Sequence, residues 1–138
     1  MLLSARFYLM FSALAFVLIG LNTFHDPVAA MAGIELMPGS VSALNEVRAN
    51  YGGMQITIGL VLLAGALRAA MLRPALWFSA AITGGLAAGR VISIALDGPP
   101  NTVVTVLLGI EATSALIALF LLWRLPAHAA QRSSGDKQ

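Results

Sequence analysis

The stretch VVTVLLGIEATSALIALFLLW, residues 103–123, carries one charged residue, Glu111, in an otherwise apolar run. A run of about 20 such residues is long enough to cross the hydrocarbon core of a bilayer as an α-helix. Three similar runs precede it, at residues 5–24, 49–70 and 74–96. Because lipid cannot hydrogen-bond the backbone, each run must be helical. The sequence therefore predicts an all-α fold, an integral membrane four-helix bundle.

The composition agrees with this fold class and leaves little room for another domain. Of the 138 residues, 59% are hydrophobic and only 10% are charged, which is unusual for a soluble domain. Residues 1–125 are expected to form a single four-helix transmembrane domain, and residues 126–138 a disordered cytoplasmic tail. The alternative for the first run is a cleaved signal peptide, but its length favours a retained helix. The absence of Cys excludes thiolate chemistry.

Charge is distributed unevenly between the connections of the four spans. Six basic residues fall on one side, namely Arg6, Arg68, Arg73, Arg124, Arg132 and Lys137. The acidic residues Asp26, Glu35, Glu46 and Asp97 fall on the other side or at its boundary. The positive-inside rule then places both termini in the cytoplasm and turns the loop of residues 25–48 outward. No basic face remains that would support a nucleic-acid partner.

The outward loop and the third run hold two further structural signals. Residues 28–37 are apolar enough to form a short helix in the outer interface, which could act as a lid. Ser40 or Ser42 can cap a helix that leads into the second run. In the third run, small residues recur every four positions, at Ala81, Gly85, Gly89 and Ser93. This pattern favours close packing on a neighbouring helix of the bundle, shared with Gly52, Gly53, Gly59 and Gly65, with self-association or docking to a larger complex as alternatives.

Polar side chains inside the spans are the candidate functional residues, because ionisable groups are costly at bilayer depth. Arg48, Tyr51 and Gln55 are spaced to share one face of the second helix, and Arg90, Ser93 and Asp97 repeat that spacing on the third. Glu111 lies ten residues past Asn101, about 15 Å along the helix axis. An ion pair between Arg90 and Glu111 is the first expectation. Asn22, His25 and Asp26 could complete the cluster.

The candidate ligand-binding residues permit three interpretations. The set comprises Arg48, Tyr51, Gln55, Arg90, Asp97 and Glu111. In the first, ion pairs of Arg90 with Glu111, and of Arg48 with Glu46 or Asp97, only tie the helices together. In the second, a pocket open to the outer leaflet binds an anionic or carbonyl-bearing head group. In the third, Glu111 relays protons, although an adjacent Arg argues against this role.

Several chemistries are not supported by any pattern in the chain. His25 and His128 are expected on opposite sides of the membrane, so no haem is expected. No metal site and no other cofactor are predicted, since His25 and the nearby acidic residues lack a recognised ligand spacing. Glu111 with Tyr51 is the one set that could serve an intramembrane enzyme, so catalysis ranks last.

The motif NExRxxYGG at residues 45–53, followed by GRxxSxxxDGxP at residues 89–100, resembles a family of small four-span bacterial membrane proteins. That family is catalogued as a domain of unknown function and is distantly similar to DoxX-like proteins. The resemblance covers residues 1 to about 125. It implies a four-helix bundle in a bacterial inner membrane and brings no established activity.

Together these features predict a small membrane protein that binds a lipid-like or quinone-like amphiphile in a pocket open to the outer leaflet. The same features also predict an accessory subunit of a membrane complex, which belongs to the same class of function. The alternatives are a small proton-coupled transporter that uses Glu111, and an intramembrane enzyme. The expected partners are membrane lipids, a small amphiphilic ligand, and either further copies of the chain or a larger complex.

Overall fold

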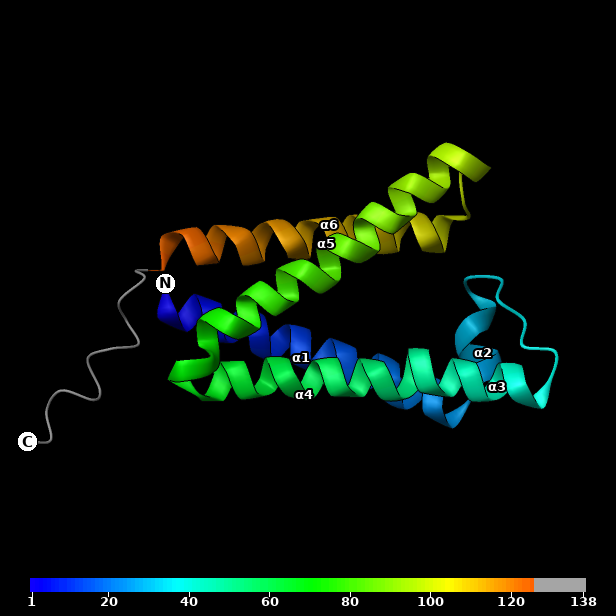
Figure 1. The fold of residues 1–138 in the computed structure, drawn as a ribbon, viewed down its shortest axis with the longest axis horizontal. Helices are drawn as coiled ribbons and strands as arrows, with labels where there is room; N and C mark the ends of the chain where they lie inside the picture. The colour runs from blue at the N-terminus through cyan, green and yellow to red at the C-terminus, as the bar shows by residue number, and fades with distance from the viewer. Residues whose placement is uncertain (126–138) are drawn as a thin grey trace, which may run out of the picture.

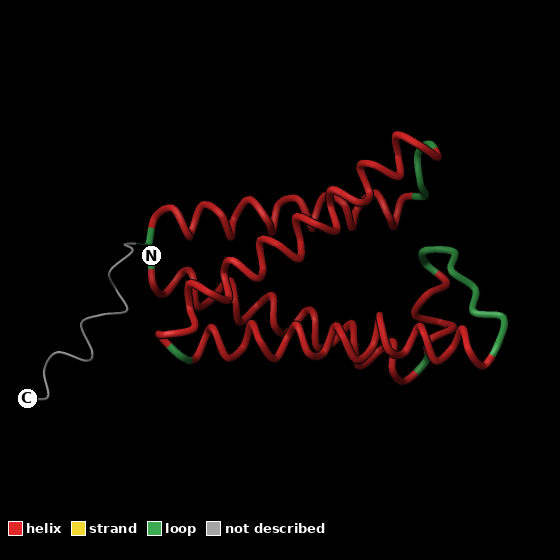
Figure 2. Tube along the Cα trace, in the orientation of Figure 1, coloured by secondary structure: helices red, strands yellow, loops and turns green. Residues whose placement is uncertain are grey.

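A computed structural model describes residues 1–125 of the chain; the predicted disordered tail lies outside the described residues. The described part consists of helices joined by short loops (Figure 2). The elements are α1 (Leu2–His25), α2 (Pro27–Ala32), α3 (Val41–Val47), the π-helical turn η1 (Arg48–Gly53), α4 (Met54–Leu67), the 3-10 turn η2 (Ala69–Met71), α5 (Leu72–Asp97) and α6 (Thr102–Arg124).

Four helical stretches are long and apolar enough to cross a membrane. They are Leu2–His25, Val41–Leu67, Ala69–Asp97 and Thr102–Arg124. Many large apolar side chains on them are exposed, among them Phe7, Leu116 and Trp123. A soluble protein rarely exposes so much contiguous apolar surface, whereas lipid accepts it. These helices indicate a membrane protein, and each predicted apolar run lies largely within one of them.

The helices form two antiparallel pairs, α1 with α4 and α5 with α6 (Figure 1). The pairs meet at the end where α1 and α5 begin and where α4 and α6 finish, and α5 crosses obliquely between them. Buried apolar residues are concentrated at this end, including Leu9 on α1, Leu62 on α4, Leu76 on α5 and Leu122 on α6. Toward the other end, the two pairs diverge.

Glycines permit the close approach of α1 and α4. A Cβ atom at Gly59 would lie 2.6 Å from Val17 Cγ2 and 2.8 Å from the Ala13 carbonyl oxygen. Gly20 is equally tight, since a Cβ atom there would lie 2.7 Å from the Gly52 carbonyl oxygen. The expectation that Gly52 and Gly59 would serve the third span was therefore wrong, because both pack on α1.

The stripe of small residues on α5 does not pack against other residues that the structure describes. Ala81, Gly85, Gly89 and Ser93 are all exposed, and a Cβ atom at Gly85 or Gly89 would have no neighbour within 4 Å. The predicted intramolecular contact of this stripe is therefore wrong. A different face of α5 is buried, the one that carries Leu76, Ser79, Thr83 and Ala87. The larger side chains on that face fill the space against the other helices.

The outward loop is less helical than predicted. Only Pro27–Ala32 is helical, rather than residues 28–37, because Glu35 adopts a positive φ of 60° that no helix can contain. Ser40 caps α3 as expected, with its hydroxyl oxygen accepting from the Ala43 amide at 3.1 Å. The helix that follows runs through η1 into α4, so it begins eight residues before the predicted span 49–70 and ends at Leu67.

Candidate ligand-binding cavity

A cavity of about 1050 Å³ lies between the two helix pairs, where they diverge. Its lining residues come from α1, α2, η1, α4, α5 and α6, and from the segment that follows α2. Most of the wall is apolar, with Phe11 and Phe16 from α1, Leu86 from α5, and Leu107 and Ile117 from α6. This volume is at the upper end of typical small-molecule sites, which range from about 300 to 1,000 Å³.

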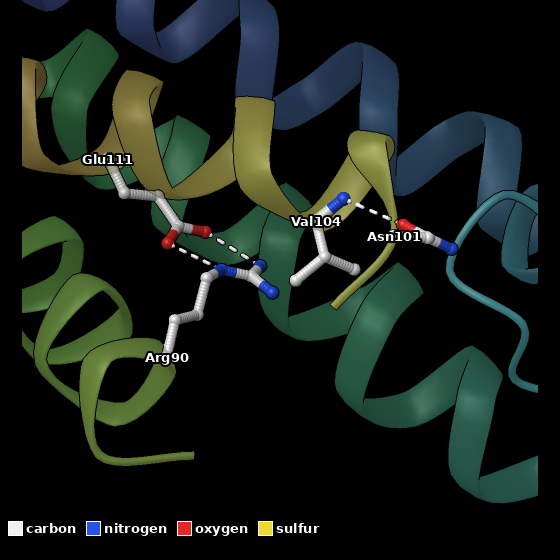
Figure 3. Close-up of polar contacts among 4 residues, drawn as sticks. All are labelled: Arg90, Asn101, Val104 and Glu111. Carbon is white, nitrogen blue, oxygen red and sulfur yellow. Dashed lines mark hydrogen bonds and ion pairs between the residues drawn. The ribbon is translucent and has the colours of Figure 1, made fainter. Parts of the chain in front are cut away.

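Arg90 on α5 and Glu111 on α6 form an ion pair in the cavity wall (Figure 3). Arg90 Nε donates to Glu111 Oε2 at 2.7 Å, and Arg90 Nη2 donates to Glu111 Oε1 at 2.8 Å. Glu111 is buried, with 8% of its surface exposed. Two parallel bonds of this kind are the strongest geometry that Arg and a carboxylate can adopt. The contact predicted from the depth of the two residues is confirmed.

Uncharged polar groups face the cavity from the other helix pair. Tyr51 at the end of η1, Gln55 on α4 and Asn22 on α1 all line it. Gln55 Oε1 is shielded from solvent and has no hydrogen-bond partner among the described residues. A buried polar atom without a partner costs free energy. The Gln55 amide therefore has hydrogen-bonding capacity that the described part of the protein does not use.

Two predicted ligand-binding residues lie away from this cavity. Arg48 Nε donates to the Phe24 carbonyl oxygen at 3.2 Å, so this side chain satisfies a carbonyl in the last turn of α1. Asp97 is exposed at the end of α5, where it accepts from the Ser93 hydroxyl at 3.2 Å. Arg48 and Tyr51 both lie in the π-helical turn, whose wider turn does not maintain the i, i+3, i+7 stripe of an ideal α-helix.

The predicted ties of Arg48 to Glu46 or Asp97 are absent from the described residues. Glu46 instead accepts from Asn50 Nδ2 at 2.9 Å, one turn further along the same helix. Of the polar residues proposed at the end of α1, Asn22 lines the cavity, whereas His25 and Asp26 do not.

Tyr8 on α1 forms the polar floor of the cavity, a feature that the sequence did not reveal. Its hydroxyl lies 2.7 Å from Ser79 Oγ on α5 and 2.8 Å from Ser114 Oγ on α6, and it donates to the Ser114 carbonyl oxygen at 3.0 Å. One hydroxyl thus links three helices. A lone Tyr in an apolar run is a weak signal, and Ser79 and Ser114 are distant from it in sequence.

The end of the cavity where the helix pairs diverge is covered by α2 and the residues after it. Met31 and Ile34 line the cavity there. Asn101 holds this segment in place, since its Nδ2 donates to the Gly33 carbonyl oxygen at 3.1 Å and to Glu35 Oε1 at 3.0 Å. The Oδ1 atom of Asn101 accepts from the Val104 amide at 3.0 Å and so caps α6 (Figure 3). The loop thus covers the cavity as a lid. Only Pro27–Ala32 of this lid is helical, which is shorter than the predicted helix of residues 28–37.

The arrangement suits binding better than chemistry. Both carboxylate oxygens of Glu111 are engaged by Arg90, so this group is not free to accept a proton from a substrate. Residues 1–125 contain no group of three or more His, Cys, Asp or Glu residues that could hold a metal ion. The cavity is a largely apolar volume with a few polar groups in its wall.

The comparison with protein families adds one match that spans nearly all of this architecture. The model of a domain of unknown function, DUF4345, matches residues 4–122. The chain belongs to the DUF4345 family. All residues that line the cavity lie within the matched region. The resemblance to an uncharacterised family is thereby confirmed, and DUF4345 brings no activity with it. No curated protein and no solved structure matches the chain.

Proposed function

We propose that the protein binds a lipid-like or quinone-like amphiphile in the cavity between its two helix pairs. The supporting observation is the cavity of about 1050 Å³, which is apolar except for a few polar groups. Ligand sites are typically concave, largely apolar and oriented by a small number of polar groups. The head group would lie near Tyr51, Gln55 and Arg90, and the hydrocarbon chain along Phe11, Phe16 and neighbouring apolar residues.

The proposal includes the membrane setting, a bacterial inner membrane with both termini in the cytoplasm and a four-span plan like that of DoxX-like proteins. Arg6, near the start of α1, and Arg68, after the end of α4, lie at the end of the molecule opposite the lid. Basic residues concentrate on the cytoplasmic side of membrane proteins. The cavity then opens toward the outer leaflet, from which an amphiphile enters without crossing water.

Proton-coupled transport and catalysis have less support. Both would require the Glu111 carboxylate to be free to exchange partners, but both of its oxygens are bonded to Arg90. A transporter of this size would need a carboxyl group that alternates between partners. In the described residues, Glu111 is the one acidic side chain that lines the cavity.

Native mass spectrometry of the protein released from a gentle detergent tests the proposal. We expect the wild-type chain to carry a discrete bound mass of lipid size. Gly109 lines the cavity, and a Cβ atom there would have no neighbour within 4 Å. Gly109→Phe should therefore place a ring in the cavity and remove the bound mass.

Gly85→Phe is the matched control, because Gly85 also has open space around it but does not line the cavity. This variant should retain the bound mass. The absence of a bound mass on the wild-type chain, or a bound mass that persists in Gly109→Phe, would contradict binding in this cavity.

A further inference from the structure

The charges that line the cavity cancel. Among the described residues, the lining contains one cation, Arg90, and one anion, Glu111. The other candidate charges, Arg48 and Asp97, do not contribute to the lining, for the reasons given above. A charged head group in this cavity would therefore meet no net opposite charge.

The bidentate geometry makes this neutrality difficult to change. Arg90 Nε and Nη2 each bind a different oxygen of Glu111, at 2.7 and 2.8 Å. A phosphate or carboxylate that competed for Arg90 would leave the buried Glu111 carboxylate without a partner. It would also approach that carboxylate closely, and like charges repel strongly in an apolar site. An anionic ligand is thus opposed by this ion pair, although the pair contains an arginine.

Uncharged hydrogen-bonding groups are available instead. The Gln55 side chain makes no hydrogen bond among the described residues; its Oε1 is shielded from solvent, so the group that it can offer to a ligand is the Nε2 donor of the amide. Tyr51 and Asn22 line the same side of the cavity, on the helix pair opposite Arg90 and Glu111. An amide and a phenol recognise hydroxyl and carbonyl groups without requiring a charge.

We propose that the ligand of this cavity is an amphiphile with an uncharged head group bearing a hydroxyl or carbonyl oxygen. The inference rests on the proposed function and narrows it to one chemical class. Of the two head-group classes expected from the sequence, anionic and carbonyl-bearing, it retains the second and excludes the first. The Arg90–Glu111 pair acts as a charge filter, and the Gln55 amide supplies a hydrogen bond to the head group.

Two lipids with the same acyl chains provide the test, dioleoylglycerol and dioleoyl phosphatidic acid, titrated into detergent-solubilised protein and followed by native mass spectrometry. They differ only in the phosphate. We expect the wild-type chain to bind dioleoylglycerol more tightly than phosphatidic acid, by about tenfold or more. Equal binding, or tighter binding of phosphatidic acid, would overturn the inference.

Glu111→Gln supplies a gain of binding that partial unfolding cannot imitate. It leaves Arg90 without a carboxylate partner, so affinity for phosphatidic acid should rise by about tenfold. The double variant Arg90→Gln with Glu111→Gln should again prefer dioleoylglycerol, because it restores neutrality. An unchanged preference in Glu111→Gln would show that the pair does not select against anions.

Failure of the inference is distinguishable from failure of the proposed function. If phosphatidic acid binds and Gly109→Phe prevents it, the cavity binds an amphiphile but the head-group class is wrong. If neither lipid binds and the wild-type chain carries no co-purified mass, both proposals are overturned.

Discussion

Arg90 and Glu111 depend on each other because each compensates the charge of the other in a largely apolar cavity wall. Removing one partner from a buried pair typically costs about 3–5 kcal/mol, because the remaining charge loses its compensation. The Arg90 side chain is 27% exposed, so we expect Glu111→Ala to lower the free energy of unfolding by about 3 kcal/mol. Denaturant unfolding in detergent micelles measures this change.

The double variant Arg90→Met with Glu111→Leu is the control for this prediction. It replaces both charges by apolar side chains and should lie within about 1 kcal/mol of the wild type, since no charge is left unpaired. If the losses of Arg90→Met alone and Glu111→Leu alone simply add in the double variant, the two residues are not energetically coupled and the prediction is wrong.

At the residue scale, the sequence predicted a contact between two side chains that lie at the same depth on neighbouring helices. Arg90 and Glu111 could be paired because helix rise converts residue number into depth. Arg48 could not be placed, because its partner is the Phe24 backbone carbonyl, which any residue could offer. Tyr8 was missed for a related reason, since its partners Ser79 and Ser114 lie on two other helices.

At the scale of elements, the close contact of α1 with α4 depends on the lack of a side chain at Gly59. Gly59→Ala would bring a methyl group to 2.6 Å from Val17 Cγ2 and 2.8 Å from the Ala13 carbonyl oxygen. We expect a loss of about 1–3 kcal/mol in the free energy of unfolding, because the helices must separate. Thermal unfolding monitored by circular dichroism measures it.

Gly85→Ala is the matched control on α5, where a Cβ atom would have no neighbour within 4 Å. This change should leave stability unaltered or raise it by up to about 1 kcal/mol, since Ala favours the helix over Gly. A loss at Gly85 as large as that at Gly59 would mean that the exposed face of α5 is packed against something else.

Asn101 joins two elements through the two ends of one amide. Asn101→Ser keeps an oxygen that can cap α6, but it removes the Nδ2 donor to Gly33 and Glu35. We expect faster amide exchange in residues 27–36 and unchanged exchange in α6, which hydrogen-exchange mass spectrometry resolves. Faster exchange in both segments would show that the cap, rather than the link to the lid, is the main role of Asn101.

The elements themselves were predictable where apolar length decides them. The four long helices follow from runs of about 20 apolar residues. Two irregular features, the π-helical turn η1 and the short helix α2, were not predicted from the sequence. The π-helical turn at Arg48–Gly53 places Gly52 against Phe24 of α1, and the short length of α2 follows from the left-handed backbone at Glu35. Each depends on a local backbone geometry that the residue types at these positions do not dictate.

At the scale of the whole molecule, the cavity arises from the divergence of two helix pairs (Figure 1). Hydropathy gives the number of helices, but it does not give the angles between them. Those angles depend on where large and small side chains meet, such as Leu76 on the buried face of α5 and Gly85 on its exposed face. Tyr51, Gln55, Arg90 and Glu111 could be named from the sequence, but the volume between the helix pairs could not.

The orientation of the molecule can be tested because the chain contains no Cys. Gly39 lies in the exposed loop before α3, and Ala70 is exposed in η2 at the opposite end. If both termini are cytoplasmic, Gly39→Cys should react with a membrane-impermeant maleimide on intact cells. Ala70→Cys should react only after permeabilisation. The reverse pattern would invert the topology and open the cavity toward the cytoplasm.

The π-helical turn η1 has one further consequence, for motion. Its hydrogen bonds span five residues, as in the bond from the Met54 amide to the Ala49 carbonyl oxygen, so it holds one residue more than an α-helical turn. Converting η1 into an α-helical turn would require that residue to leave the helix and would rotate α3 by about 100° against α4. Because α3 is joined to the lid through residues 33–40, that rotation would also move the lid.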